Sequence, residues 1–378
     1  MEEKIRTLVQ ANSPANRMKW AQEWKKQGKK VIGLLCSYIP EEIIYAADML
    51  PWRVTGTWET TTPNAETYRI STSCRYCNHV LESLLTGELD FLDGVIGTAL
   101  DDDVRCLWDV WKYLNKTPFT HIMYLPHKKG RLPESLWIRE TERLKKEMEK
   151  FGGLTITDEK LFEATEVINK TRSLLMRLYE LRKHEPPPLT GAEALGITTA
   201  ATVMVKEVFN QQLEPLISYL ESGDRVVRNS SPRLLVSSDM LDDLRYLELI
   251  EDVGSLVAMD DLDTGSRYFR DLVDTSSTDI IKSLGTRYLN RPASAHMYDW
   301  DKQADQIISW VEEYKITGVI ELPLLHSFPR EFRSPFLKER LNQANIPNVS
   351  IGRDYGLTNV GQLRTRIGAF IEMIQSEV

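Results

Sequence analysis

The sequence predicts a mixed α/β fold with two doubly wound domains, each with a roughly four-stranded parallel sheet, joined by a helical bridge. The chain has 378 residues, more than a single hydrophobic core usually organises. In both halves, short apolar runs alternate with segments whose apolar residues recur at helical spacing. Because strands that alternate with helices pair in parallel through right-handed crossovers, this order predicts one doubly wound domain in each half.

The first half alternates expected strands with expected helices. The strands are expected at residues 30–36, 52–55, 91–97 and 120–125. The helices between them are expected at about 40–50, 74–85 and 104–111. Pro40 suits the start of a helix, and Gly87 suits the position just after the end of one.

The second half follows the same plan. Its expected strands are residues 233–237, 255–259, 318–322 and 348–352, and a last helix is expected at about 358–374. Between the halves, helices are expected at about 133–150, at 158–183 and as a pair within 192–221. The proline run at 184–188 cannot be helical and marks a boundary. We therefore expect a first α/β domain at 1–150, a helical bridge at 151–225 and a second α/β domain at 226–378.

The composition is that of a soluble globular protein, with 42% hydrophobic and 27% charged residues. The net charge of −8 argues against a large nucleic-acid surface, because such a surface needs clustered lysine and arginine. No apolar run approaches the ~20 residues that cross a bilayer, and the first residues lack the layout of a signal peptide. We therefore expect a cytoplasmic protein that binds neither nucleic acid nor membrane.

The four cysteines, Cys36, Cys74, Cys77 and Cys106, all lie in the first part of the chain. Cys36 ends the first expected strand, Cys74 and Cys77 begin a helix, and Cys106 follows the third strand. In a parallel sheet these positions share the edge where ligands bind, so the sequence predicts one site. In a reducing compartment such a group is more typical of metal or redox chemistry than of disulfides.

Cysteine chemistry leaves three interpretations of this site. The positive end of a helix lowers thiol pKa, which would favour thiolates at Cys74 and Cys77. Four thiolates suit either an iron–sulfur cluster or a structural zinc ion. Zinc ribbons usually contain paired CxxC motifs, whereas here one CxxC motif is joined by two isolated cysteines, which favours a cluster. The third interpretation is buried structural cysteines beside a chance pair.

Several segments resemble one enzyme superfamily. The run GLLCSYIPEEIIYAADMLP at residues 33–51 resembles the opening signature of the 2-hydroxyacyl-CoA dehydratase and ATP-dependent benzoyl-CoA reductase superfamily. Further similar segments are SCRYC at 73–77, PLTGAE at 188–193, DD at 260–261 with GSRY at 265–268, and GQLRTRIGAF at 361–370. Together they follow the order of that superfamily over nearly the whole chain.

The resemblance implies two flavodoxin-like domains and an oxygen-sensitive iron–sulfur cluster, either [4Fe-4S] or a larger cluster linked to a partner. It implies a homologous second cluster subunit, substrates that are CoA thioesters, and an ATP-hydrolysing activator that donates low-potential electrons, with a ferredoxin upstream. The sequence contains no GxxxxGK[ST] phosphate loop, which agrees with ATP hydrolysis in a partner subunit rather than in this chain.

The chain departs from the superfamily pattern in its second half. Many members have a ligand cysteine after the strand that corresponds to 318–322, where this chain reads LLHSF, and another position often held by cysteine is Asp263 here. Cys36, Cys74, Cys77 and Cys106 would then complete the ligand set within one domain. Four thiolate ligands leave no iron atom with a free coordination position, and such a cluster suits electron relay. His326 could replace the missing ligand or donate a proton, or it could simply be a polar residue at the rim.

The expected function is the iron–sulfur subunit of an ATP-dependent benzoyl-CoA reductase, which passes low-potential electrons for reduction of an aromatic acyl-CoA ring to a cyclic diene. One alternative is the smaller subunit of a 2-hydroxyacyl-CoA dehydratase, with radical loss of water. Another is a two-domain binding protein with a structural four-cysteine zinc site. His79 could tune the cluster or be solvated, and Asp101 to Asp103 predict a helix cap. No catalytic acid or base is predicted.

Overall fold

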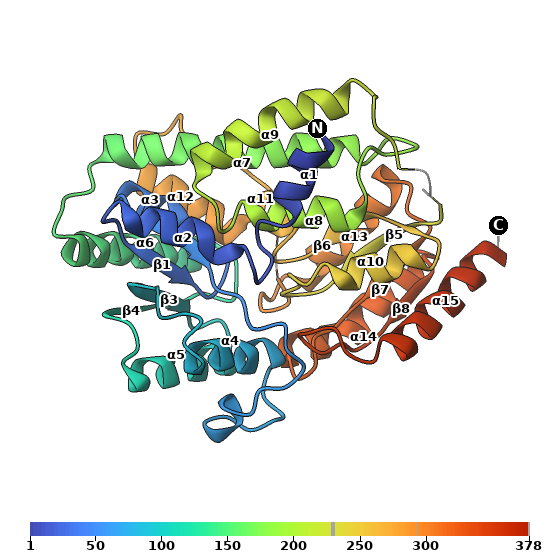
Figure 1. Ribbon diagram of the computed structural model, residues 1–378, viewed down its shortest axis with the longest axis horizontal. Coiled ribbons are helices and arrows are strands. Elements are labelled where there is room, and N and C mark those ends of the chain that lie inside the picture. Colours follow the sequence, from blue (N-terminus) through green and yellow to red (C-terminus); the bar gives the residue numbers. More distant parts are fainter. Residues whose placement is uncertain (228–230, 293, 377–378) are drawn as a thin grey trace.

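Two parallel four-stranded sheets form the framework of the computed structural model, which describes residues 1–227, 231–292 and 294–376 (Figure 1). The first sheet has the order β2-β1-β3-β4, and the second has the order β6-β5-β7-β8. The strands of the first are β1 (Val31–Leu34), β2 (Leu50–Arg53), β3 (Gly94–Thr98) and β4 (Phe119–Met123). The strands of the second are β5 (Arg233–Ser237), β6 (Leu256–Asp261), β7 (Gly318–Glu321) and β8 (Asn348–Ser350). Each sheet follows the flavodoxin-like winding order, so the predicted fold class is confirmed.

Burial explains why most strands were visible as continuous apolar runs. All residues of β1, β3 and β5 are buried, as expected for parallel sheets with helices on both faces. β2 begins at Leu50, two residues before the predicted start at 52, and therefore includes Pro51. A proline is tolerated there because β2 lies at the edge of its sheet and pairs only with β1 among the described strands.

The helices of the first part are α1 (Glu2–Val9), α2 (Arg17–Lys26), α3 (Glu41–Ala46), α4 (Arg75–Leu85) and α5 (Asp102–Leu114), with a short 3-10 helix η1 (Ala65–Thr67). Gly87 lies just beyond α4 with a φ of 84°, as its sequence position predicted. The predicted cap of α5 is also confirmed, because the Asp101 carboxylate accepts the Val104 N–H at 2.8 Å.

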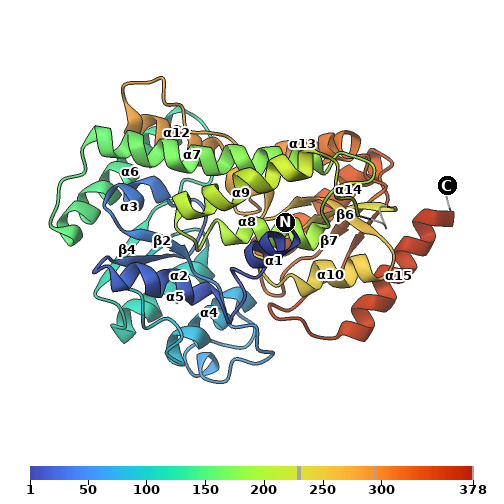
Figure 2. The same ribbon diagram turned by 45° about the horizontal axis from the view of Figure 1, so that its top comes forward.

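Long helices connect the two sheets. They are α6 (Arg131–Gly152), α7 (Asp158–Leu181), α8 (Gly191–Ala200) and α9 (Lys206–Glu221). α7 contacts α3 of the first half and α11 of the second, and it runs past both sheets (Figure 2). Thr190 and Glu193 form a capping box at the start of α8. Gly191 lets α8 pack against β6, because a Cβ at this position would lie 2.5 Å from the Val257 Cβ.

The second half contributes α10 (Arg245–Asp252), α11 (Ser266–Phe269), α12 (Ile280–Asn290), α13 (Trp300–Glu313), α14 (Phe328–Gln343) and α15 (Val360–Ser376). α12 packs against α6 and α7, although it follows β6 in the chain. The larger hydrophobic core cluster accordingly contains residues from both halves. The domain boundaries at 150 and 225 stay a prediction.

Residues that follow strands of the two sheets meet between the halves. Ser37, after β1, donates a hydrogen bond to Asp263, after β6. The carboxyl ends of strands are where ligands bind in folds of this kind, so the junction of the halves is the place to look for a site. In the described ranges, no helix is long and apolar enough to span a membrane.

Candidate functional site

A small cavity lies between the halves, and we call it the thiol cavity. Its first-half wall includes Cys36, Cys74, Tyr76 and Asp101, and its second-half wall includes Asp239, Asp263 and His296. Cys36, Asp239 and Asp263 follow strands and Cys74 and Asp101 begin helices, as the winding of the two sheets dictates, whereas His296 lies between α12 and α13.

Cys36 occupies a buried position two residues beyond β1. Its Sγ lies 3.0 Å from Thr98 Oγ1, and it accepts the Tyr38 N–H at 3.4 Å. Burial raises the pKa of Cys36 and outweighs the nearby Arg53 guanidinium. The side chain is therefore held in a fixed place with its sulfur at the wall of the thiol cavity.

Cys74 and Cys77 are one helical turn apart at the start of α4. Cys74 is the N-cap residue and lines the thiol cavity, while Cys77 is fully buried beside it. The neighbouring Cys74 thiol and burial raise the pKa of Cys77. The sequence-based expectation that the helix terminus lowers the thiol pKa is wrong for Cys77, because the neighbouring thiol and burial dominate.

Cys106 is exposed on α5. The buried face of α5 contains Val104, Leu107 and Trp111, and the helical period turns Cys106 away from it. The structure therefore places Cys36 and Cys74 at the wall of the thiol cavity and Cys77 in the interior beside Cys74, and it leaves Cys106 on the solvent side. A four-cysteine ligand set stays a prediction. Within the described part of the chain, no three Cys, His, Asp or Glu side chains are arranged around a common point as metal ligands. The three buried thiols fit an iron–sulfur cluster by donor type, since such clusters are held by cysteine.

Asp263, at the position often occupied by cysteine in the superfamily, is engaged by two arginines. Its carboxylate lies 2.7 Å from Arg53 and 3.1 Å from Arg291, and it also accepts the Ser37 hydroxyl. These cations hold the pKa of Asp263 well below its usual range, against the effect of burial. The Asp263 carboxylate therefore ties the two halves together. Sequence analysis identified neither Arg53 nor Arg291 as its partner.

Asp101 and His296 form a second tie between the halves. His296 Nε2 lies 2.9 Å from Asp101 Oδ2, and the other Asp101 oxygen caps α5. Although burial opposes a charged imidazole, the Asp101 carboxylate raises the pKa of His296. Sequence analysis treated Asp101 as a cap and did not single out His296, which follows α12 without a recognisable motif.

Two other histidines behave differently from each other. His79 is buried rather than solvated, with Nδ1 2.9 Å from the Thr57 carbonyl oxygen and Nε2 3.8 Å from Asp354. His326 is half-buried with a φ of 63°, and its neighbours Leu324 and Ser327 line the thiol cavity where His326 does not. The structure therefore places His326 at the rim.

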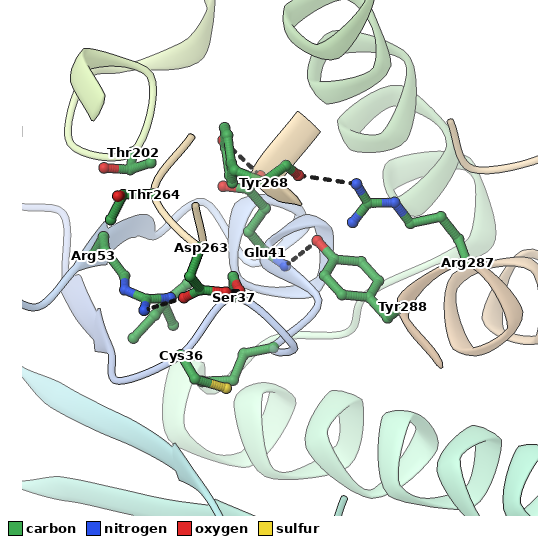
Figure 3. A pocket seen from close by; sticks show the side chains of 12 residues that line it. Cys36, Ser37, Glu41, Arg53, Thr202, Asp263, Thr264, Tyr268, Arg287 and Tyr288 are labelled. Carbon is green, nitrogen blue, oxygen red and sulfur yellow. Dashed lines mark hydrogen bonds and ion pairs between the residues drawn. The ribbon is translucent and has the colours of Figure 1, made fainter. Parts of the chain in front are cut away.

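Figure 3 shows a second cavity, whose wall includes Cys36, Glu41 and Tyr268. Cys36, Arg53 and Asp263 line both cavities. Glu41 on its wall lies 2.8 Å from Lys206 Nζ and accepts the Tyr268 hydroxyl at 2.9 Å. Although burial raises the pKa of Glu41, Lys206 and Arg172 lower it more.

Glu42, the next residue, pairs with Arg172 at 2.7 Å. The PEE segment at residues 40–42 therefore supplies buried ion pairs that fix α3 against α7 and α9. Its two glutamates also lie in the first turn of α3, where negative charge is favourable.

Comparisons with known proteins agree with the resemblance. The family described as 2-hydroxyglutaryl-CoA dehydratase, D-component, matches residues 36–374. The chain is 27% identical to the (R)-2-hydroxyglutaryl-CoA dehydratase beta subunit of Acidaminococcus fermentans, over 93% of this chain and 94% of that one. It is 26% identical to the (R)-phenyllactyl-CoA dehydratase beta subunit of Clostridium sporogenes, over 93% of each chain. It is also 26% identical to a benzoyl-CoA reductase subunit of Thauera aromatica, over 94% of each chain. The chain therefore belongs to the family of 2-hydroxyglutaryl-CoA dehydratase D-components, whose similar members are subunits of dehydratases and of a reductase.

Proposed function

We propose that this chain is the iron–sulfur subunit of a multi-subunit enzyme that acts on CoA thioesters, and that its reaction is reduction of the aromatic ring of benzoyl-CoA to a cyclic diene. The observation that carries the proposal is the position of Cys36 and Cys74 at one cavity between the halves, with Cys77 buried one helical turn from Cys74. Similarity to a benzoyl-CoA reductase subunit over 94% of the chain agrees with this reaction.

The residues at the cavity have defined tasks in this proposal. Cys36, Cys74 and Cys77 would hold the cluster, and Cys106 would either join them or face a partner subunit. When bound, the cluster would supply single low-potential electrons. Burial of the thiols keeps water away from them. Arg53 and Arg291 pair with Asp263 near Cys36, so their positive charge offsets the negative charge of this carboxylate. ATP hydrolysis and delivery of electrons from ferredoxin belong to partner subunits, and the enzyme is completed by a second, homologous subunit with its own cluster.

A second reaction, dehydration of a 2-hydroxyacyl-CoA, is favoured by the position of Cys106. Because this thiol is exposed, a cluster held by Cys36, Cys74 and Cys77 would keep one ligand position free for a substrate oxygen. That arrangement suits a lyase better than an electron relay. Similarity to two dehydratase beta subunits, at 27% and 26% identity, agrees with this reaction equally well.

The test is anaerobic co-purification of the chain with its partner subunits, followed by two assays with ATP and a reductant. Turnover of benzoyl-CoA to a diene supports the reductase, and release of water from a 2-hydroxyacyl-CoA supports the dehydratase. A colourless chain that contains stoichiometric zinc in place of iron and sulfide would contradict both and favour a structural zinc protein.

A further inference from the structure

We propose that His296, held by Asp101, relays protons between solvent and the thiol cavity. This inference rests on the proposed function, because both candidate reactions consume or release protons at the substrate. It adds a proton-handling residue to a site in which sequence analysis found no acid or base.

The His296 imidazole is fixed by its partner. Asp101 is anchored at the start of α5 by the Val104 N–H, so its second oxygen can hold His296 Nε2 at 2.9 Å. A carboxylate on one ring nitrogen orients the imidazole and leaves the other nitrogen, Nδ1, to exchange a proton. Only 10% of the His296 side chain is exposed, so solvent reaches one edge of the ring.

His296 and Asp101 line two cavities at once. On the inner side they face the thiol cavity with Cys36 and Cys74. On the outer side they face a groove whose wall also includes His127, Tyr298 and Phe332. The Tyr298 side chain at this groove is 71% exposed and that of Phe332 is 74% exposed, so the groove is open to water. The pair is therefore part of the wall between solvent and the buried thiols.

On the inner side, hydroxyl groups connect His296 with the thiol cavity. His296 Nδ1 lies 3.4 Å from Ser294 Oγ, which lies 3.4 Å from the Tyr38 hydroxyl. Both Ser294 and Tyr38 line the thiol cavity, as Cys36 does.

The charges around His296 favour its protonated form. Asp101, Asp239 and Asp263 all act on it with negative charge, and Arg69 is a cation near Asp101. Asp239 Oδ1 is buried and has no hydrogen-bond partner in the described ranges, so the thiol cavity contains an unsatisfied acceptor for a proton or a donor group. His127, the other histidine of the groove, contacts the backbone oxygen of His296 through Nδ1 at 2.8 Å.

His296 makes the same transfer in either reaction. The imidazolium gives its Nδ1 proton to an acceptor in the thiol cavity and becomes neutral imidazole, while its Nε2–H keeps the hydrogen bond to Asp101. In ring reduction the acceptor is the ring, which takes up two electrons from the electron donor and two protons, and water in the groove returns a proton to Nδ1 after each transfer. In dehydration the acceptor is the departing hydroxyl, which leaves as water. The substrate also loses a proton from the carbon next to the one that carried the hydroxyl, and the neutral imidazole takes up this proton, so that dehydration consumes no net proton.

Two variants of the intact anaerobic complex test the relay. His296→Gln keeps an N–H donor for Asp101 but cannot release a proton, and we expect turnover to fall by roughly 100-fold or more with iron content unchanged, as general acid catalysis contributes ~10²–10⁴-fold. His296→Ala opens the wall toward the groove, so added 4-methylimidazole should restore part of the turnover. Its effect should vary with pH as the added imidazole titrates. His184→Gln, at an exposed histidine that lines neither the thiol cavity nor the groove, is the matched control and should stay within about twofold of wild type.

Turnover of His296→Gln within about twofold of wild type would overturn the relay. The relay would also be overturned if 4-methylimidazole did not restore turnover in His296→Ala, or if the variants lost iron together with turnover. Either result would mean that His296 only holds the structure together. An NMR titration of the chain gives a readout independent of turnover. The His296 imidazole should titrate at lower pH in Asp101→Asn than in wild type, and an unchanged midpoint would contradict the pairing. Absence of turnover with both thioesters in the wild-type complex would defeat the proposed function instead.

Discussion

Arg53 at the end of β2 and Asp263 beyond β6 form a buried ion pair with 2.7 Å between Nη2 and Oδ2. The pair joins the two halves of the chain at the wall of both cavities, and Arg291 adds a second cation at 3.1 Å. An aspartate thus forms a tie between the halves at the position where many superfamily members have a cysteine.

Asp263→Asn should strongly destabilise the folded chain. It leaves Arg53 and Arg291 buried without their carboxylate, and removal of one partner of a buried pair costs about 3–5 kcal/mol. Urea denaturation followed by circular dichroism measures the loss. The control is Asp252→Asn, which breaks an exposed pair with Arg364 and should change stability by less than about 0.5 kcal/mol. Equal effects of the two variants would contradict the role of Asp263.

Two glycine-to-alanine substitutions should change the free energy of unfolding in opposite directions. At Gly191 the added Cβ would meet the Val257 backbone oxygen at 2.6 Å, so Gly191→Ala should lower the free energy of unfolding by about 1–3 kcal/mol. Gly368 lies inside α15 with open space around it, so Gly368→Ala should raise the free energy of unfolding by about 0.5–1 kcal/mol. Denaturation midpoints of both variants check this, and a stabilised Gly191→Ala would refute the close packing of α8 on β6.

Glu251 should make stability depend on pH. Its carboxylate accepts the N–H groups of Gly191, Ala192 and Val257, yet burial raises its pKa from 4.5 to about 7. Because the folded chain then binds the proton more tightly, this stabilisation is present below pH 4.5 and is lost as pH rises to 7.

Conversion of this pKa shift to free energy gives an upper limit of ~3 kcal/mol for the stabilisation that is lost by pH 8. Glu251→Gln stays neutral, so the difference in unfolding free energy between pH 5 and pH 8 should be smaller in the variant than in wild type. Identical differences would show that Glu251 is ionised throughout this range.

Most of the strands could be predicted from the sequence because parallel strands buried on both faces appear as apolar runs. The predicted strand 233–237 has the bounds of β5, whereas the strand predicted at 52–55 is two residues later than β2. The exposure of Cys106 could have been predicted from the spacing of Val104, Leu107 and Trp111 along α5. The pair of Asp101 and His296 could not have been predicted, because it joins segments 195 residues apart and has no local sequence pattern.

The thiols should differ sharply in reactivity in the native chain without a cluster. Cys36, Cys74 and Cys77 are buried, and the pKa values of Cys36 and Cys77 are raised, whereas Cys106 is exposed. Thiolate is the reactive form, so iodoacetamide should rapidly modify Cys106 and leave the other three unmodified, and urea should expose all four. Mass spectrometry of peptides identifies the sites. Fast modification of Cys36 would contradict its burial.

The central claim is that the buried thiols at the thiol cavity hold an iron–sulfur cluster, and the most direct measurement is iron and acid-labile sulfide per chain after anaerobic purification. We expect a brown wild-type protein with absorption near ~400 nm, loss of iron in Cys74→Ser, and retention of iron in Cys106→Ser. Loss of iron in both variants would support the four-cysteine ligand set instead. Wild-type protein without iron and sulfide, or Cys74→Ser with unchanged iron, would contradict the account.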